Sequence, residues 1–453
     1  MSDAIIIGGG ISGLASAYYL SKKSLSSTLI EAQTRLGGLI RTDVISGCQI
    51  EGGPDSYVST KPEATELAQD IASLKGEVIG TNDASRRIYL VNGGKLVPMP
   101  AGMVLMVPGN MRAALGSCLF PDSTRRQILE ERFFKPKQRD QDISVADLVL
   151  DHFDRNILEI IAEPLLTGVY GGNAARLSAG SVLPRFLEYE RHYGSLIRAV
   201  RDERKQTQQH GSLFLSFKGG MQQLTDAVYR ASSGAVTRVT GEATRIMRQN
   251  AGWQVRVGDT KHEAKFLVVA VPAYRAARLF SDSVPPLAEE LDDIPYSSAI
   301  TVVLGYVRSD IAHPLDGFGF LVPRSERRRV AACTWINTKF PQRIAPEYAA
   351  LRGFVVDTDA EALMANTDAE IIGVVRKEFI RLMGIEAKPV FSSVQRWPLS
   401  MPQYVVGHGA RWQRISTLVQ NERGLHLVGN AYEGVGIPDC IRLAKNAAAG
   451  IEV

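Results

Sequence analysis

The chain has 453 residues, of which 45% are hydrophobic and 22% are charged, and this composition excludes a wholly disordered or coiled-coil chain. Its 52 basic and 48 acidic residues leave a formal net charge of +4, an excess too small to indicate nucleic-acid binding. The four cysteines are far apart and form no CxxC pair, so we expect a reducing compartment, no disulfide framework and no bound metal.

This length corresponds to two or three domains at about 150 residues each. The chain opens without the basic region of a signal peptide, and no apolar run approaches the roughly 20 residues that cross a bilayer. We therefore expect a cytoplasmic protein, and we leave open a peripheral position at the inner face of the cell membrane.

The opening of the chain indicates a strand, a helix and a second strand. Ala4–Ile7 is a short β-branched run that ends in glycines, as a buried parallel strand would. The apolar residues of Ile11–Lys22 are spaced for one face of a helix, and Ser27–Glu31 has the composition of another strand. This order predicts a parallel βαβ unit.

The turn between the first strand and the helix has the spacing of a dinucleotide-binding site, Gly8-x-Gly10-x-x-Gly13. The first glycine allows a tight turn, the second lets the backbone approach a pyrophosphate, and the third lets the helix pack on the strand. The pyrophosphate would lie against free N–H groups at the helix N-terminus. Glu31, 18 residues past Gly13, is placed to accept both ribose hydroxyls of an adenosine, and its charge argues against NADP.

Residues farther along favour FAD over NAD. Arg35 can neutralise a pyrophosphate, and Gly37 with Gly38 would let the chain pass close to an extended cofactor. Gly52-Gly53-Pro54 forms another glycine turn. This arrangement resembles the FAD-binding opening of the flavin amine oxidase superfamily.

The middle of the chain indicates a helical part followed by strands. We expect mostly helices from about residue 60 to 205, interrupted by the proline-rich stretch 98–108. Basic residues between Arg125 and Arg139 indicate a solvated helix and loop, or else a membrane-facing surface. Strands are expected at 214–217, 234–239, 253–257, 266–270, 299–306, 319–322, 329–335 and 351–356, and a helix at 368–382.

A last strand and helix supply a second cofactor-contacting end. Residues 425–428 indicate the strand, and Pro438 suits the first turn of the helix. The N-terminus of that helix could direct its partial positive charge at the flavin N1–C2=O edge, which gains negative charge on reduction. The two ends are about 400 residues apart, so other domains must be inserted between them.

Longer segments resemble the oxygen-dependent porphyrinogen oxidases of haem biosynthesis over essentially the full length. The matching segments include 87–94, 98–100, 163–172, 177–178, 190–196, 401–408 and 432–440. Segments 332–337 and 436–439 look most like the Gram-positive-type enzymes, which are similar to coproporphyrinogen III oxidases more than to the mitochondrial protoporphyrinogen oxidases.

The resemblance implies an α/β fold of several domains (α+β multidomain). A Rossmann-like FAD-binding domain of the p-hydroxybenzoate hydroxylase type is expected at 1–85, 211–285 and 411–453. A helical domain that can lie on membranes is expected at 86–210, and an inserted substrate-binding β-sheet domain at 286–410. The resemblance places non-covalent FAD against Gly8, Gly9, Gly10, Ile11, Ser12, Gly13, Glu31, Ala32, Arg35, Gly38, Leu39, Gly53, Pro54, Asp55, Ser56, Thr244, Asn430, Val435, Gly436 and Ile437.

The implied reaction oxidises coproporphyrinogen III to coproporphyrin III by successive hydride transfers to flavin N5, with oxygen as acceptor and hydrogen peroxide as product. Because the porphyrinogen ring is electron-rich, its orientation supplies much of what is needed, and we expect no catalytic acid or base. Protoporphyrinogen IX is the alternative substrate. Another enzyme of the flavin amine oxidase type, or a non-catalytic binder on this fold, is a more distant alternative.

Three residues are candidates for substrate binding. Arg87 matches an arginine of the family that binds a substrate carboxylate, although it could also be a surface arginine beside Arg86. Gly168 and Val169 match a loop that lines the family's pocket, although Gly168 could simply end a helix. Packing roles are expected for Trp335, Trp397, His408 and Cys440.

The implied partners are the porphyrinogen substrate and molecular oxygen, and no nucleic acid. The resemblance further suggests a homodimer, peripheral membrane contact and hand-over of the product to a ferrochelatase.

Overall fold

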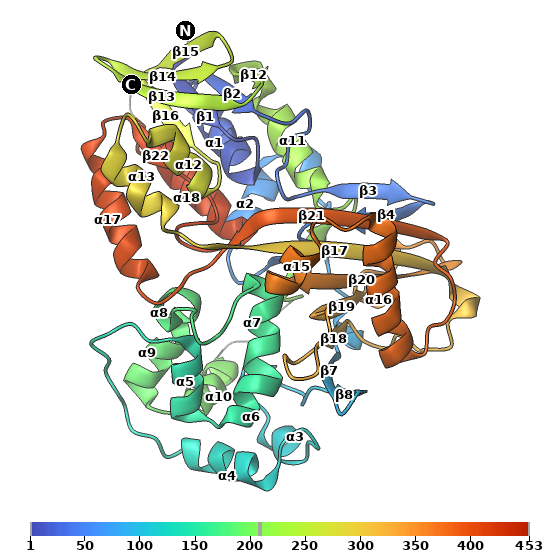
Figure 1. The fold of residues 1–453 in the computed structure, drawn as a ribbon. Helices are drawn as coiled ribbons and strands as arrows, with labels where there is room; N and C mark the ends of the chain where they lie inside the picture. Colours follow the sequence, from blue (N-terminus) through green and yellow to red (C-terminus); the bar gives the residue numbers. More distant parts are fainter. Residues whose placement is uncertain (1, 207–210, 452–453) are drawn as a thin grey trace.

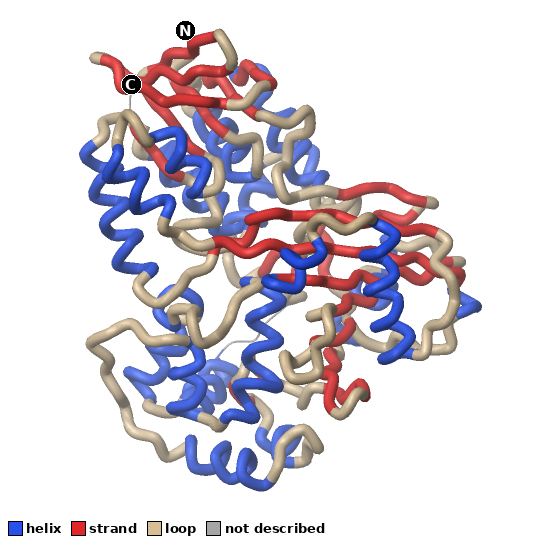
Figure 2. Tube along the Cα trace, in the orientation of Figure 1, coloured by secondary structure: helices blue, strands red, loops and turns tan. Residues whose placement is uncertain are grey.

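The computed structural model describes residues 2–206 and 211–451, which form an elongated molecule (Figure 1). A parallel sheet with its helices occupies one end, a large and mainly antiparallel sheet the middle, and a group of helices the other end. In Figure 2 the strands are concentrated in the first two regions, whereas the third is almost wholly helical. The three regions meet at mid-height, where the site residues described below converge.

The first region, which we call the nucleotide region, is built on five parallel strands from separate stretches of the chain. Their order in the sheet is β12 (Val236–Thr240), β2 (Ser27–Glu31), β1 (Ala4–Ile7), β16 (Phe266–Val269) and β22 (Leu425–Leu427). Counted by appearance in the chain, this is the doubly wound order 3-2-1-4-5. In such sheets the ligand crevice lies at the carboxyl ends of the strands where the order reverses, here beside β1.

Helices cover both faces of this sheet. The helix α1 (Ile11–Lys22) packs against α11 (Gln222–Ser232) and α18 (Ile437–Ala449), so the two ends of the chain lie together. The predicted βαβ opening is confirmed at its expected bounds. The other elements of the region are α2 (Glu63–Asp70), β13 (Ala243–Gln249), β14 (Gly252–Val257), β15 (Thr260–Ala264), α12 (Ala273–Phe280), α13 (Pro285–Asp292) and α17 (His408–Asn421).

The second region is a seven-stranded sheet, which we call the large sheet. Its order is β21 (Phe391–Pro402), β17 (Tyr296–Val307), β20 (Tyr348–Val356), β19 (Ala332–Trp335), β18 (Gly319–Leu321), β7 (Ile88–Asn92) and β8 (Lys95–Pro98). Only β18 and β7 pair in parallel. The helices α15 (Asp357–Leu363) and α16 (Asp368–Met383) lie over one face.

Alternation along β17 explains how the large sheet serves the site. Side chains of successive strand residues point to opposite faces. Ile300, Val302 and Leu304 point into the core beneath α16, because they are apolar and fully buried there. Thr301 therefore points to the other face, which is turned toward the nucleotide region.

The third region, which we call the helical lobe, spans residues 111–206. Its helices are α3 (Met111–Leu115), α4 (Asp122–Glu131), α5 (Val145–His152), α6 (Arg155–Ile157), α7 (Glu163–Tyr170), α8 (Ala179–Val182), α9 (Pro184–Tyr193) and α10 (Leu196–Gln206), with a π-turn at Leu158–Ala162. The lobe has its own apolar core, to which Ile128, Leu148 and Leu196 belong. Among the described residues, no helix is long and apolar enough to span a membrane.

The expectation of mostly helices from about 60 to 205, with an interruption at 98–108, is wrong from 78 to 97, and short strands continue through the whole stretch 78–108. That stretch holds β6 (Val78–Gly80), β7, β8, β9 (Met103–Val104) and β10 (Val107–Pro108). β6 pairs with β11 (Phe214–Phe217), which also pairs with β5 (Tyr57–Val58), and β7 pairs with β18. These strands exist because distant segments complete their hydrogen bonds, which a local helical pattern does not reveal.

Smaller differences concern the ends of elements. The strand expected at 234–239 begins at Val236, because Ser233–Ala235 is a 3-10 turn, and the one expected at 329–335 begins at Ala332. The strand β21 and the hairpin of β3 (Thr42–Ile45) and β4 (Cys48–Glu51) were not expected. Residues 88–98, placed in the helical domain by the sequence, lie in the large sheet, and the expected boundary at 210 falls outside the described residues.

Candidate cofactor and substrate site

The glycine turn between β1 and α1 has no room for side chains. A Cβ on Gly13 would lie 1.9 Å from the carbonyl oxygen of Gly8, and one on Gly9 would lie 2.6 Å from a methyl carbon of Leu36. The helix α1 begins after Gly10 without a side-chain cap and without an acidic residue in its first turn. Its N-terminal N–H groups and partial positive charge fit a pyrophosphate, as predicted for the segment from Gly8 to Gly13.

Glu31 lies at the carboxyl end of β2, beside this turn. Its Oε2 accepts the N–H of Gly9 at 2.7 Å and its Oε1 accepts the N–H of Gln33 at 2.9 Å. Each oxygen keeps a lone pair for another donor, so Glu31 can hold the turn and still accept a ribose hydroxyl. Ala32 follows it in an exposed position. Thr244 is exposed, and its hydroxyl donates to the carbonyl of Arg256 at 3.4 Å rather than toward Glu31.

A second loop, residues 35–40, lies against the first turn. The N–H of Gly37 donates to the carbonyl oxygen of Gly9 at 2.8 Å. A Cβ on Gly38 would lie 3.1 Å from the Cα of Gly10. The guanidinium of Arg35 donates to the carbonyls of Leu36, Gly38 and Ile40. Arg35 therefore fixes this loop, and its action on a pyrophosphate stays a prediction.

A third turn, residues 52–56, stacks on that loop. A Cβ on Gly53 would lie 1.7 Å from the carbonyl oxygen of Leu39, so the two backbones touch. The large sheet supplies the donors that hold this turn. Thr301 of β17 and Trp397 of β21 donate to the carbonyl of Gly52 at 2.6 and 2.8 Å, and Arg352 of β20 donates to Gly53.

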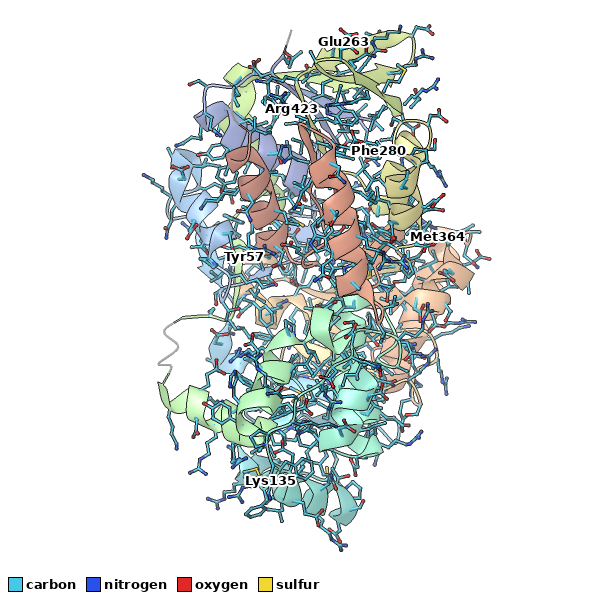
Figure 3. The ribbon with its side chains drawn as sticks, turned by 90° about the vertical axis from the view of Figure 1, so that its left-hand side faces the viewer. Tyr57, Lys135, Glu263, Phe280, Met364 and Arg423 are labelled. Atoms are coloured by element: carbon cyan, nitrogen blue, oxygen red, sulfur yellow. The ribbon has the colours of Figure 1, made fainter. Side chains whose placement is uncertain are left out.

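The side chains below this turn are charged and buried. Asp55 accepts two hydrogen bonds of 2.8 Å from Lys339, at the end of α14 (Ile336–Lys339). Although burial opposes ionisation, Lys339 and then Arg352 hold the pKa of Asp55 well below its usual range. Arg343 lies 3.2 Å from Glu51, whose pKa burial raises. Figure 3 labels the adjacent Tyr57 at mid-height.

The C-terminal cofactor segment is held by Tyr404. Its hydroxyl donates to the carbonyl of Asn430 and accepts the N–H of Gly434, both at 2.8 Å. Val435 packs against the core of the helical lobe. The N–H of Gly436 donates to Asp439 at 3.2 Å, and buried Asp439 accepts two bonds of 2.7 Å from Lys61.

The N-terminus of α18, which was predicted to face the flavin, carries a partial positive charge, and the carboxylate of Asp439 offsets it. The ammonium of Lys61 in turn compensates the negative charge of Asp439. Buried Ile437 begins α18, and buried Cys440 lies three residues on. Burial raises the pKa of Cys440 to about 11, which suits a packing role. His408 stacks on Tyr404 with ring centroids 3.9 Å apart and contacts the carbonyl of Tyr432 at 3.0 Å, which is also structural.

Arg87 lies at the start of β7, next to β18. The N–H of Phe318 donates to its carbonyl at 2.7 Å. Its half-exposed guanidinium pairs with Asp316 and reaches the hydroxyl of Tyr89 at 3.2 Å, while that hydroxyl donates to Asp316 at 2.8 Å. Arg87 is therefore a held arginine at the edge of the site, and a substrate carboxylate would compete with Asp316 for it.

Gly168 and Val169 lie on the exposed side of α7, and 54% of Val169 is exposed. The helix continues to Tyr170 and ends at Gly171, where φ is +58°, so Gly168 does not end it. A Cβ on Gly168 would lie 3.9 Å from a methyl carbon of Leu321 in β18. Arg87 and Gly168 thus lie at opposite ends of the short strand β18, Arg87 beside Phe318 and Gly168 beside Leu321.

A small depression, open to solvent, lies next to α7. Its lining is charged and balanced, with two arginines facing two acids: Glu163, Pro164, Thr167, Gly172, Asn173, Val322, Arg324, Arg327 and Asp357. Burial raises the pKa of Glu163.

Sequence reasoning placed β18, as the strand expected at 319–322, but not its role beside Arg87. It missed Tyr89 and Asp316 on the substrate side, and Thr301, Lys339, Arg343 and Arg352 below the 52–56 turn. Trp397 was expected only to pack, yet its indole N–H bonds the turn. Within β18, Gly319 has a φ of +134°, and a Cβ there would lie 1.9 Å from the carbonyl oxygen of Cys333, so the strand requires glycine at this position.

Comparison with known proteins gives matches over nearly the whole chain. A family model described as flavin containing amine oxidoreductase matches residues 11–451. Coproporphyrinogen III oxidase of Bacillus subtilis (strain 168) is 29% identical over 99% of this chain and 98% of that protein. Chloroplastic protoporphyrinogen oxidase of Nicotiana tabacum is 25% identical over 99% and 85%. A crystal structure from Exiguobacterium sp. 255-15, provisionally assigned as a protoporphyrinogen oxidase, has a TM-score of 0.87 at 28% identity and covers 98% of this chain and 97% of that one.

Three features of the structure fit FAD as the cofactor. They are the doubly wound sheet, the uncapped N-terminus of α1, and the stacking of the glycine turns at 8–13, 37–38 and 52–56. Together with the family match, they make this protein an FAD-dependent oxidase, and the chain belongs to the flavin-containing amine oxidoreductase family.

Proposed function

We propose that this protein oxidises coproporphyrinogen III to coproporphyrin III, with molecular oxygen as the final acceptor and hydrogen peroxide as the second product. The observation that carries the proposal is the similarity to coproporphyrinogen III oxidases from one end of the chain to the other. The arrangement of the site supports it, since an arginine and the exposed face of a helix both lie against β18 of the large sheet.

Bound FAD supplies a two-electron acceptor at N5. The residues from Gly8 to Gly13, with Glu31, hold the adenosine and pyrophosphate side in this proposal. The 52–56 turn and the segment from Asn430 to Ile437 hold the ring side. Ala32, Arg35, Gly38 and Leu39 shape the passage between them, and the exposed side chain of Thr244 leaves that residue only a backbone role.

The substrate side orients the macrocycle. Arg87 holds a propionate, exchanging Asp316 for the substrate's carboxylate. Gly168 adds no side chain of its own against Leu321 of β18, and Val169 offers apolar surface to the ring. Because a porphyrinogen gives up hydride readily, these residues act by positioning, and no acid or base is assigned to proton transfer.

Protoporphyrinogen IX is the second candidate substrate, since the chloroplastic relative is named for it. Anaerobic mixing of the enzyme with each porphyrinogen, followed by oxygen, separates the two. We expect faster flavin bleaching and a higher kcat/KM with coproporphyrinogen III, and peroxide release when oxygen is admitted. A higher kcat/KM with protoporphyrinogen IX would reverse the assignment, and absence of bleaching with both would refute the function.

We also propose that the helical lobe contacts membranes peripherally. Phe133 is 79% exposed, and Leu129, Arg126 and Lys135 are also exposed. Lys135 lies at the end of the lobe (Figure 3). Sedimentation with anionic vesicles should retain the protein, and Phe133→Ser should reduce that retention. If neutral and anionic vesicles lost the protein to the same extent, the result would contradict a role for the basic residues in membrane binding. The homodimer and the transfer of product to a ferrochelatase stay predictions.

A further inference from the structure

Five charged side chains meet below the 52–56 turn, and we call them the buried charge cluster: Glu51, Asp55, Lys339, Arg343 and Arg352. Two are carboxylates and three are cations, so the cluster carries one excess positive charge. The side chains of Arg343 and Arg352 are only 1% and 4% exposed. An uncompensated charge at such depth is costly unless something negative comes near it.

The hydrogen bonds and ion pairs within the cluster also leave positive groups without a negative partner in the described part of the chain. Asp55 is bonded by Lys339 and lies 3.9 Å from Arg352, and Glu51 lies 3.2 Å from Arg343. Even so, the Nε atoms of both arginines are buried without a partner among the residues that the structure describes. Arginine keeps its proton in proteins, so protonation of Glu51 would only enlarge the positive excess.

The position of the cluster links the cofactor side to the substrate side. Arg352 bonds the carbonyl of Gly53 in the turn assigned to FAD. The carbonyl of Lys339 accepts the N–H of Asn82 at 3.1 Å, in the segment that leads to Arg87. Lys339 therefore connects the 52–56 turn with the segment that leads to Arg87, and Arg352 directly contacts the turn that holds the isoalloxazine side of FAD in the proposed function.

We infer that the buried charge cluster is an electrostatic device that stabilises the reduced flavin, because its excess positive charge compensates the negative charge that the ring gains on two-electron reduction. The inference rests on the proposed placement of FAD at the 52–56 turn. These five residues act on the cofactor through their charge and need not touch the substrate.

The sign of the charge gives the test. Lys339→Met removes one positive charge, and we expect the reduction equilibrium constant of bound FAD to fall roughly tenfold, about 30 mV for a two-electron couple. Asp55→Asn removes a negative charge and should shift the potential upward by a similar amount. The double variant Asp55→Asn/Lys339→Met should return close to the parent value.

The readouts are the reduction potential of the FAD-loaded protein, measured against a reference dye, and the affinity of the oxidised flavin for sulfite, whose adduct is also anionic. Sulfite should bind more weakly to Lys339→Met and more tightly to Asp55→Asn. Lys22→Met is the matched control, since Lys22 pairs with Asp70 at the surface. Lys339→Arg keeps the charge and should keep the potential.

Shifts of both single variants in the same direction, or no larger than that of Lys22→Met, would overturn the inference. If Lys339→Met does not retain FAD, the direction of the shift in reduction potential is tested by Asp55→Asn alone. Continued porphyrinogen oxidation without charge-dependent potentials would reject the inference and keep the proposed function. If the reduction potential depended on these charges but the enzyme oxidised neither porphyrinogen, the inference would stand and the proposed function would be rejected.

Discussion

The nucleotide region and the substrate side of the molecule are built by contacts of very different reach. In the nucleotide region, Glu31 bonds Gly9 across 22 residues of sequence. On the substrate side, Arg87 pairs with Asp316 across 229 residues. The 52–56 turn also depends on distant residues, since Trp397 reaches Gly52 across 345. The glycine turn at 8–13 is thus a local structure with a local sequence signature. The substrate side exists only once the large sheet has assembled.

The largest expected effect tests the local character of the nucleotide region. In Gly13→Ala the added Cβ meets the carbonyl of Gly8 at 1.9 Å, a backbone atom that cannot move aside. We expect a loss of more than about 3 kcal/mol in unfolding free energy and no retained flavin. Denaturant titration and the flavin-to-protein absorbance ratio measure both.

Gly373→Ala in α16 is the matched control, because a Cβ there meets open space. It should leave both quantities unchanged or slightly raise stability, since alanine is the better helix former. Retention of FAD by Gly13→Ala would show that the turn is less constrained than the structure indicates.

The next effect tests whether the helical lobe is independent of the cofactor. Buried His152 contacts Glu131 at 3.0 Å and Glu190 at 3.1 Å. Burial opposes its protonation, but the two carboxylates outweigh burial and raise the pKa of His152. The stabilisation is therefore complete below the ordinary histidine value near 6.5 and is lost as the pH rises through the raised pKa.

His152→Leu should cost about 1–3 kcal/mol at acidic pH and flatten the pH dependence of stability, as thermal unfolding at several pH values would show. FAD content should not change. His192→Ala, in an exposed position on α9, is the control. Loss of flavin from His152→Leu would mean that the lobe and the nucleotide region are coupled.

A smaller effect is expected at the ribose side. Glu31→Ala removes the acceptor of the Gly9 N–H and, in our assignment, of the ribose hydroxyls. We expect FAD to bind about tenfold more weakly, equivalent to about 1.4 kcal/mol, in a titration of the apoprotein. Glu66→Ala removes only a surface pair with Lys445 and should bind normally. Purification of Glu31→Ala with full stoichiometric flavin would contradict the assignment.

The smallest effect concerns the substrate side. Arg87→Ala should raise KM several-fold and change kcat less, because a carboxylate anchor binds ground state and transition state alike. Steady-state kinetics at two salt concentrations would show the difference shrinking at high salt. Arg86→Ala, the exposed neighbour, should leave KM unchanged. An unaltered KM in Arg87→Ala would remove Arg87 from the site.

Part of the fold could be predicted because its cause lies in neighbouring residues. The βαβ opening follows from a β-branched run, a glycine turn and a helical period within about thirty residues, and its bounds are confirmed. The strands β11 and β16 and the helix α16 were placed within a residue or two for the same reason. Residues 78–97 were not, since their short strands have no period of their own and are stabilised by partners far along the chain.

By itself the sequence determined the cofactor class, because phosphate and ribose recognition requires glycines and an acid at short, fixed spacings. The substrate-side candidates Arg87 and Gly168 came from a family resemblance, not from such spacing. Only the tertiary structure decided that both lie at β18, that Asp316 holds Arg87, and that three cations meet two carboxylates below the 52–56 turn. Those neighbours come from strands that pair across hundreds of residues. The burial of a side chain and the balance of charge around it depend on which segments of the chain meet in space.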